Sequence, residues 1–79
     1  MDNGDQLKQL NHRQYDALES AITHGHRVSI DRRGTEYVGI PQRLHSVGTR
    51  EAVDIRHPTT GDLITIYLDE INRLEVVAR

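Results

Sequence analysis

The fold is decided by one stretch of sequence, NHRQYDALESAITHGHRVSID at residues 11–31. Its first half carries apolar side chains at helical spacing, which predicts an amphipathic helix with one buried stripe. These side chains belong to Tyr15, Leu18 and Ile22. After Gly25 the spacing changes, because Val28 and Ile30 alternate with polar residues as in a half-buried strand. The stretch therefore predicts a helix that leads directly into a β-strand.

The ends of the helix are marked by residues that favour helix caps. Asn11 can accept a hydrogen bond from an amide of the first turn, and Gln14 can reach back to complete a capping box. Gly25 suits the left-handed conformation that ends many helices. We therefore predict a helix over residues 12–25. A helix of this length is unstable alone, so it must pack on the rest of the chain.

Beyond the helix, alternating apolar residues separated by turn residues predict five short strands. The predicted strands cover residues 27–31, 35–40, 50–57, 62–68 and 72–77. We expect Gly39 to mark a bend, Pro41 to interrupt the second strand, and Leu44 to return to the core. A single tight helical turn is expected at 69–71, before the last strand.

The same alternation predicts which side chains face the core and how the sheet ends. Val53 and Ile55 should face inward, and Asp54 and Arg56 outward. On the fourth predicted strand, Ile64, Ile66 and Leu68 share one face, and Leu63, Thr65 and Tyr67 share the other. On the last strand, Leu74 and Val76 should face inward. Closing a small sheet removes its exposed edges. The predicted fold class is therefore α+β, mainly β: an N-terminal helix packed on a small, closed, five-stranded antiparallel barrel.

The length and composition of the chain argue against catalysis. Seventy-nine residues form one domain with a thin core, which leaves little room for an enzyme pocket. The chain has no cysteine, and its five histidines lack the spacing of a zinc site, so we expect no metal and no cofactor. Asp69 and Glu70 are adjacent, but at a water-exposed turn their pKa values should be ordinary. We expect a monomeric binding domain that is not an enzyme.

The domain organisation and location follow from the ends of the chain. Residues 1–10 are polar and aperiodic and are predicted to form a flexible arm, while residues 11–79 form the single domain. The first residues lack the charge and apolar pattern of a signal peptide. No apolar run approaches the length of a membrane span. The cytoplasm is the expected location.

The charge pattern leaves two binding surfaces open. Asp16 and Glu19 lie on the helix, and Asp2 and Asp5 on the arm, so one end of the domain suits a basic partner. Residues 26–57 instead contain six arginines and four carboxylates. Together with an exposed tyrosine, such arginines suit stacking on single-stranded RNA and contacts with its phosphates. The net charge of −2 is less basic than that of a typical nucleic-acid-binding domain.

Two motifs resemble the Rof family of bacterial Rho-binding antiterminators. Residues 11–19, NHRQYDALE, are similar to the family's N-x-x-x-Y-D-x-L-E at the head of its helix, and residues 68–71, LDEI, to its L-D-x-I before the last strand. The resemblance implies an Sm-like barrel capped by the helix. It also implies binding to the RNA-loading domain of transcription termination factor Rho, competition with RNA, and reduced Rho-dependent termination. The partner-binding residues it implies are Asn11, Tyr15, Asp16 and Glu19.

Two considerations refine that resemblance. Tyr15 and Leu18 are expected in the core, so Asp16 and Glu19 are the stronger candidates for contact with a partner. Arg13 and Gln14 stand where a member of that family is acidic, which implies weaker mimicry of the charge of RNA.

A second resemblance implies a different function. Residues 40–44, IPQRL, together with Thr60-Gly61 and residues 67–71, YLDEI, are similar to the WYL domain of bacterial regulators. That resemblance implies a small regulatory barrel that binds RNA or a nucleotide through basic and aromatic side chains. The residues it implies are Arg43, Arg50, Arg56 and Tyr67.

Overall fold

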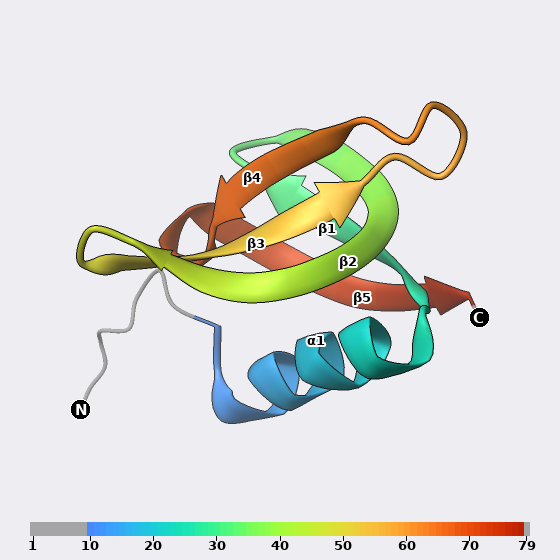
Figure 1. Ribbon diagram of the computed structural model, residues 1–79. Coiled ribbons are helices and arrows are strands. Elements are labelled where there is room, and N and C mark those ends of the chain that lie inside the picture. The colour runs from blue at the N-terminus through green and yellow to red at the C-terminus, as the bar shows by residue number, and fades with distance from the viewer. Residues whose placement is uncertain (1–9, 79) are drawn as a thin grey trace.

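One helix, five antiparallel strands and one short 3-10 turn make up the part of the chain that the structure describes, as Figure 1 shows. The computed structural model describes residues 10–78. Its elements are α1 (His12–His24), β1 (Arg27–Arg32), β2 (Thr35–Val47), β3 (Arg50–Arg56), β4 (Leu63–Tyr67), η1 (Leu68–Glu70) and β5 (Ile71–Ala78). The predicted fold class, a helix on a small antiparallel sheet, is confirmed.

Helix α1 begins and ends at the predicted caps. The Asn11 side chain accepts a hydrogen bond from the amide of Gln14 at 2.8 Å, and the Gln14 side chain accepts one from the amide of Asn11 at 3.1 Å. Gly25 has a φ of 71° and ends the helix in the left-handed conformation. Of the predicted arm, residues 1–9 lie outside the described residues, and Leu10 packs against the core.

The strands form one sheet in the order β4-β3-β2-β1-β5. In Figure 1 this sheet curls strongly, and β4 and β5 are its two edges. Among residues 10–78, no pairing joins β4 to β5, so hydrogen bonds do not close the predicted barrel into a complete cylinder. The strand order is that of a barrel opened along one seam.

The prediction that Pro41 interrupts the second strand is wrong. β2 runs unbroken through Pro41, pairing with β1 over its first half and with β3 over its second. The residue pairs opposite Ile55, and the register shifts between Pro41 and Arg43, which places an irregularity at Gln42. Such irregularities accommodate proline, because a bulged residue gives up its ladder hydrogen bond. The proline therefore bends β2 instead of ending it.

The predicted bend at Gly39 coincides with a close approach of two strands. A Cβ atom added there would lie 2.5 Å from Cγ2 of Ile55 and 2.7 Å from the carbonyl oxygen of Arg56. Real Cβ atoms do not come so close to neighbouring atoms, so only glycine fits where β2 crosses β3.

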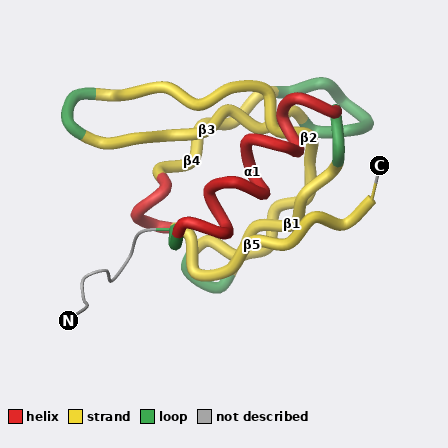
Figure 2. The backbone as a smooth tube through the Cα atoms, turned by 90° about the horizontal axis from the view of Figure 1, so that it is seen from below, coloured by secondary structure: helices red, strands yellow, loops and turns green. Residues whose placement is uncertain are grey.

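Helix α1 covers the inner side of the curled sheet. Seen from below, it lies between β1 and β5 on one side and β3 and β4 on the other (Figure 2). The buried apolar side chains that meet there are Leu18, Ala21, Val28, Ile30, Val53, Ile55, Ile66, Leu68, Ile71 and Leu74. Within residues 10–78, no helix is long and apolar enough to cross a membrane.

Three of the positions with a predicted facing differ in exposure from what their side of the strand suggests. Val76 is 44% exposed, although it pairs opposite the buried Val28, and the register of β1 and β5 shifts next to that pair. Ile64 pairs opposite the buried Ile55 but is 38% exposed, because it lies at the open end of the curled sheet. Asp54 faces away from Val53 and Ile55 as predicted, but it is only 8% exposed, since side chains of β2 and β4 cover it.

Candidate binding surfaces

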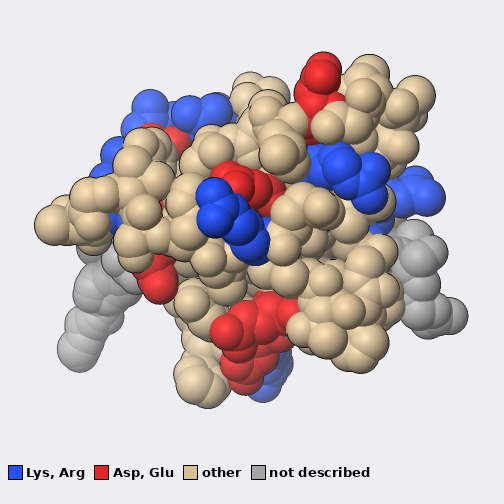
Figure 3. Space-filling model, viewed as in Figure 1, with Lys and Arg blue, Asp and Glu red and all other residues tan. Residues whose placement is uncertain are grey.

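The outer face of α1 presents two carboxylates to solvent. Both Asp16 and Glu19 are exposed. Within residues 10–78, the one ion-pair partner of Asp16 is His12, with Nε2 of the histidine 3.7 Å from Oδ2, and both side chains are largely exposed. Glu19 makes no ion pair with any residue in the described range. In Figure 3 acidic atoms gather over α1, while the two signs of charge are interspersed on the rest of this face. We call Asp16 and Glu19 the acidic helix face.

The other two residues implied by the first resemblance have structural roles. Asn11 caps α1. Tyr15 is half-buried against the core, and its hydroxyl donates to Oε2 of Glu51 on β3 at 3.4 Å. Burial, followed by the nearby charges of Glu51 and Glu19, raises the pKa of Tyr15 above its ordinary value. Glu51 thus brings a further carboxylate close to the acidic helix face, and the sequence motifs do not include it.

Beside Glu19, a shallow groove runs between α1 and β2. Its volume is about 500 Å³, and Ile22 and Leu44 supply apolar surface within it. Thr23, Gln42 and Arg43 complete the lining. An acidic side chain next to apolar surface can receive a partner segment that carries both a basic and an apolar residue.

The residues implied by the second resemblance lie on one face of the sheet. Arg50 and Arg56 share a side of β3, because they are an even number of residues apart. Arg43 of β2 pairs opposite Asp54 on that side, and Tyr67 of β4 pairs opposite Ala52. The outer side of β2, β3 and β4 therefore brings all four residues together. We call this set the basic sheet face.

Most of the charge on the basic sheet face is already neutralised. Nε of Arg43 donates to Oδ2 of Asp54 at 2.9 Å. Arg50 makes a two-pronged contact with Asp69, at 2.7 and 3.1 Å, and its guanidinium lies 3.6 Å from the centre of the Tyr67 ring. The exposed surface of the ring needed for stacking on a base is thus occupied by an arginine of the same chain.

Asp54 accepts hydrogen bonds from three side chains on its two neighbouring strands, β2 and β4. Besides Arg43, it accepts from Nε2 of His45 at 2.9 Å and from the hydroxyl of Thr65 at 2.8 Å. Burial alone would raise the pKa of Asp54, but these three donors outweigh burial and leave the pKa below its ordinary value. His45 is correspondingly half-buried.

The expectation of ordinary pKa values at Asp69 and Glu70 is also wrong. Hydrogen bonds from Arg50 lower the pKa of Asp69, and a hydrogen bond from Arg32 at 2.9 Å is the main reason that the pKa of Glu70 is lowered. Arg33 adds a contact to Glu70 at 3.3 Å. The predicted helical turn, which starts one residue earlier than expected, is therefore fixed by arginines from β1, the following turn and β3.

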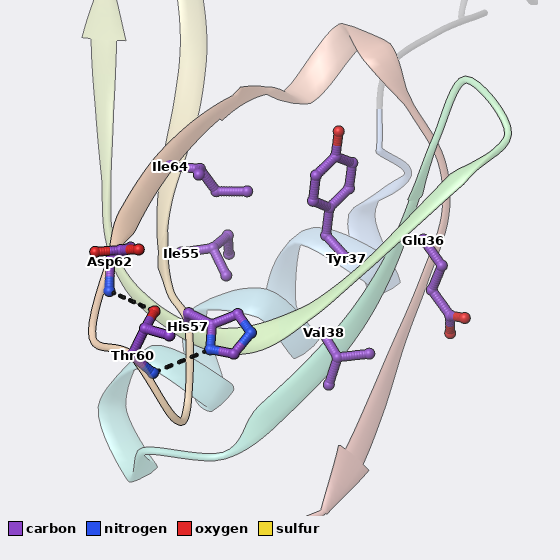
Figure 4. A pocket seen from close by; sticks show the side chains of 8 residues that line it. All are labelled: Glu36, Tyr37, Val38, Ile55, His57, Thr60, Asp62 and Ile64. Carbon is purple, nitrogen blue, oxygen red and sulfur yellow. Dashed lines mark hydrogen bonds between the residues drawn. The ribbon is translucent and has the colours of Figure 1, made fainter.

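A more enclosed cavity of about 410 Å³ lies at the open end of the curled sheet. In Figure 4, Ile55 and Ile64 face the ring of Tyr37 across this cavity, and the ring of His57 reaches toward Val38 at its mouth. Glu36, Thr60 and Asp62 complete the lining. No sequence motif pointed to this cavity, because its walls come from β2, β3, β4 and the 57–62 loop.

The histidines of the described chain do not form a metal centre. Within residues 10–78, no group of three histidine, cysteine, aspartate or glutamate side chains is arranged to hold a metal ion. His24 and His26 stack with ring centroids 5.4 Å apart, and Nδ1 of His24 lies 2.9 Å from the carbonyl oxygen of Ser20 in the preceding turn.

Comparison with known proteins gives no relative. No protein-family model matches the chain, and no curated protein matches it. The fold and these surfaces define the class of the protein as a small helix-capped antiparallel sheet with an acidic helix face, a basic sheet face and an apolar cavity.

Proposed function

We propose that this chain is a non-catalytic, protein-binding domain that uses the acidic helix face to bind a basic surface of its partner. One contrast carries the proposal: within residues 10–78, Glu19 makes no ion pair and Asp16 contacts only the exposed His12, whereas Arg43 and Arg50 are held by carboxylates of their own chain. Unpaired charge on a surface steers association and selects partners, while charge that is paired internally contributes much less.

The partner we propose is transcription termination factor Rho. Support comes from the resemblance of residues 11–19 and 68–71 to the Rof family, and from the fold class that this resemblance implies. In this proposal the domain binds the RNA-loading domain of Rho, competes there with RNA, and reduces Rho-dependent termination in a bacterial cytoplasm. Asn11 and Tyr15 act indirectly, by capping α1 and anchoring it to β3.

Purified Rho tests this proposal directly. The wild-type domain should bind immobilised Rho and displace a single-stranded RNA oligonucleotide, more strongly at low than at moderate salt. Asp16→Lys combined with Glu19→Lys should weaken binding about tenfold or more. The matched control is Asp62→Lys with Glu75→Lys, which makes the same charge change at exposed sites away from α1. No binding by the wild type, or equal losses in the two double variants, would contradict the proposal.

The basic sheet face supports a second candidate, binding of RNA or a nucleotide. The observation in its favour is that Arg43, Arg50, Arg56 and Tyr67 share one side of the sheet. Within residues 10–78, Arg56 makes no ion pair that would neutralise it. A gel shift on a short RNA should then show binding that falls steeply with salt and is weakened by Arg56→Ala but not by Arg73→Ala on β5. Negligible, salt-independent binding would eliminate this candidate.

A further inference from the structure

The cavity at the open end of the curled sheet has the composition of a ligand site. Its volume of about 410 Å³ falls within the range of small-molecule pockets, roughly 300–1,000 Å³. Ile55, at 2% exposure, forms its floor, and the side chains of Tyr37 and Ile64 form facing walls. Val38, which is 40% exposed, adds apolar surface at the mouth. An apolar body of limited size therefore fits inside.

Among the side chains that line this cavity, the imidazole of His57 is held in a single tautomer. Nδ1 of His57 accepts hydrogen bonds from the backbone amides of Thr59 and Thr60 at 3.1 and 3.2 Å. A ring nitrogen that accepts in this way has no proton, so the neutral imidazole carries its proton on Nε2. In Figure 4 the ring of His57 extends from the loop toward Val38, across the mouth of the cavity. His57 thus offers an N–H donor to a ligand.

The loop that carries His57 is fixed before any ligand arrives. The amide of His57 donates to the carbonyl of Asp62 at 2.8 Å, and the amide of Gly61 donates to the carbonyl of His57 at 3.0 Å. The hydroxyl of Thr60 accepts from the amide of Asp62 at 3.2 Å. A donor on a loop tied in this way loses little conformational freedom when it binds.

The charges around the mouth exclude anions. Glu36 and Asp62 are the carboxylates of the lining, and among the described residues no lysine or arginine lines the cavity. Figure 4 shows Glu36 pointing away from the cavity and Asp62 at its rim, so neither carboxylate fills the interior. A negatively charged ligand would meet their repulsion without a compensating cation.

We propose that this cavity binds an uncharged small molecule with an aromatic or aliphatic ring and a carbonyl-type acceptor. The ring occupies the space between Tyr37, Ile55 and Ile64, and the acceptor receives the hydrogen bond from Nε2 of His57. No lining residue belongs to α1, so the site is separate from the acidic helix face.

Three compounds with the same indole ring test the proposal by titration of the ¹⁵N-labelled full chain, followed by NMR. Indole-3-acetamide, which is uncharged, should shift the amide signals of residues 36–38 and 55–64 with a dissociation constant of about 1 mM, the scale for a ligand of this size. Indole-3-acetate should bind at least about threefold more weakly at low salt. 3-Methylindole, which is uncharged and lacks the carbonyl, should also bind more weakly than the acetamide. Shifts scattered over the surface, or acetate binding as tightly as acetamide, would overturn the proposal.

Two variants test the named contacts. In His57→Asn the side-chain oxygen can still accept from the loop amides while the Nε2 donor is lost, so affinity for indole-3-acetamide should fall about threefold to tenfold. Val38→Ser should also weaken binding, whereas Val47→Ser should not. The two valines lie on the same strand and are 40% and 41% exposed, but only Val38 lines the cavity. Unchanged affinity in both His57→Asn and Val38→Ser would refute the assignment.

Discussion

Replacing Gly39 with alanine should destabilise the domain by a steric mechanism that the structure makes specific. The new Cβ would lie 2.5 Å from Cγ2 of Ile55 and 2.7 Å from the carbonyl oxygen of Arg56. The methyl group of Ile55 can rotate, but the carbonyl belongs to the backbone of β3, so β2 and β3 must move apart. Overpacking of this kind typically costs about 1–3 kcal/mol.

An opposing effect must be subtracted from that cost. Alanine restricts the unfolded chain more than glycine does, which stabilises a protein by about 0.4–1 kcal/mol where the backbone conformation permits it. Gly39 has no positive φ, so it is such a position. When this stabilisation is subtracted from the upper end of the steric cost, a net loss of about 2 kcal/mol in the free energy of unfolding remains. For a domain of this size, that loss corresponds to a melting temperature lower by about 8–16 °C.

Urea unfolding followed by far-UV circular dichroism measures this loss. Gly48 supplies the control, because nothing lies within 4 Å of its Cβ position but its φ is 65°. Gly48→Ala should therefore cost about 1 kcal/mol through backbone strain, and Gly48→Asn less, since asparagine tolerates the left-handed conformation. Asparagine at position 39 should be at least as harmful as alanine. If Gly39→Ala is as stable as the wild type, the close crossing of β2 and β3 is not as described.

Three other substitutions test the capping and ion-pair contacts. Asn11→Ala should lower the free energy of unfolding by about 1 kcal/mol, whereas Asn11→Ser should lose much less, since serine also caps helices. Thermal melts that show no difference between Asn11→Ala and the wild type would contradict the capping box. Asp54→Asn should cost about 2 kcal/mol at neutral pH, because an amide cannot replace the carboxylate toward its three donors. Because its pKa is lowered in the folded state, Asp54 stabilises the fold fully above about pH 5, and this contribution is lost as the pH falls through the ordinary value of about 3.9 toward the folded-state pKa. Urea unfolding at several pH values should therefore show a weaker dependence of stability on acid in Asp54→Asn than in the wild type. Equal dependence of the two proteins on pH would argue against this contribution. Arg50→Lys should lower the melting temperature, because an ammonium group makes neither the two-pronged contact with Asp69 nor the stack on Tyr67. An unchanged melting temperature would show that this network is not stabilising.

Local features of the fold could be predicted from the sequence. The capping box at Asn11 and Gln14 and the glycine that ends α1 each depend on residues a few positions apart. The alternation of Val28 and Ile30 with polar residues likewise predicts β1, because the two apolar residues are also the two that are buried in that strand. Such signals need no knowledge of distant parts of the chain.

The features that could not be predicted depend on residues far apart in the sequence. Pro41 remains within β2 because β3 pairs beside it, which no local signal reports. Asp54 is buried because donors arrive from β2 and β4, so its surroundings are invisible from β3 alone. The apolar cavity likewise forms only once the start of β2 lies opposite β4.

The candidate sites divide in the same way. The sequence placed Asp16 and Glu19 on the exposed side of a helix, which the helical period alone determines. It also grouped the arginines of β2 and β3, but it could not show that Asp54 and Asp69 neutralise two of them.

The continuity of β2 also bears on how the chain can be divided. A break in the backbone at Gln42 would separate α1, β1 and the first half of β2 from the second half of β2 with β3, β4 and β5. Each fragment would keep a hairpin, but β5 and its hydrogen-bonding partner β1 would lie on different fragments. The two halves are interlocked through the pairing of the last strand with the first, so we expect the separated fragments to recombine when mixed and neither to hold a complete core alone.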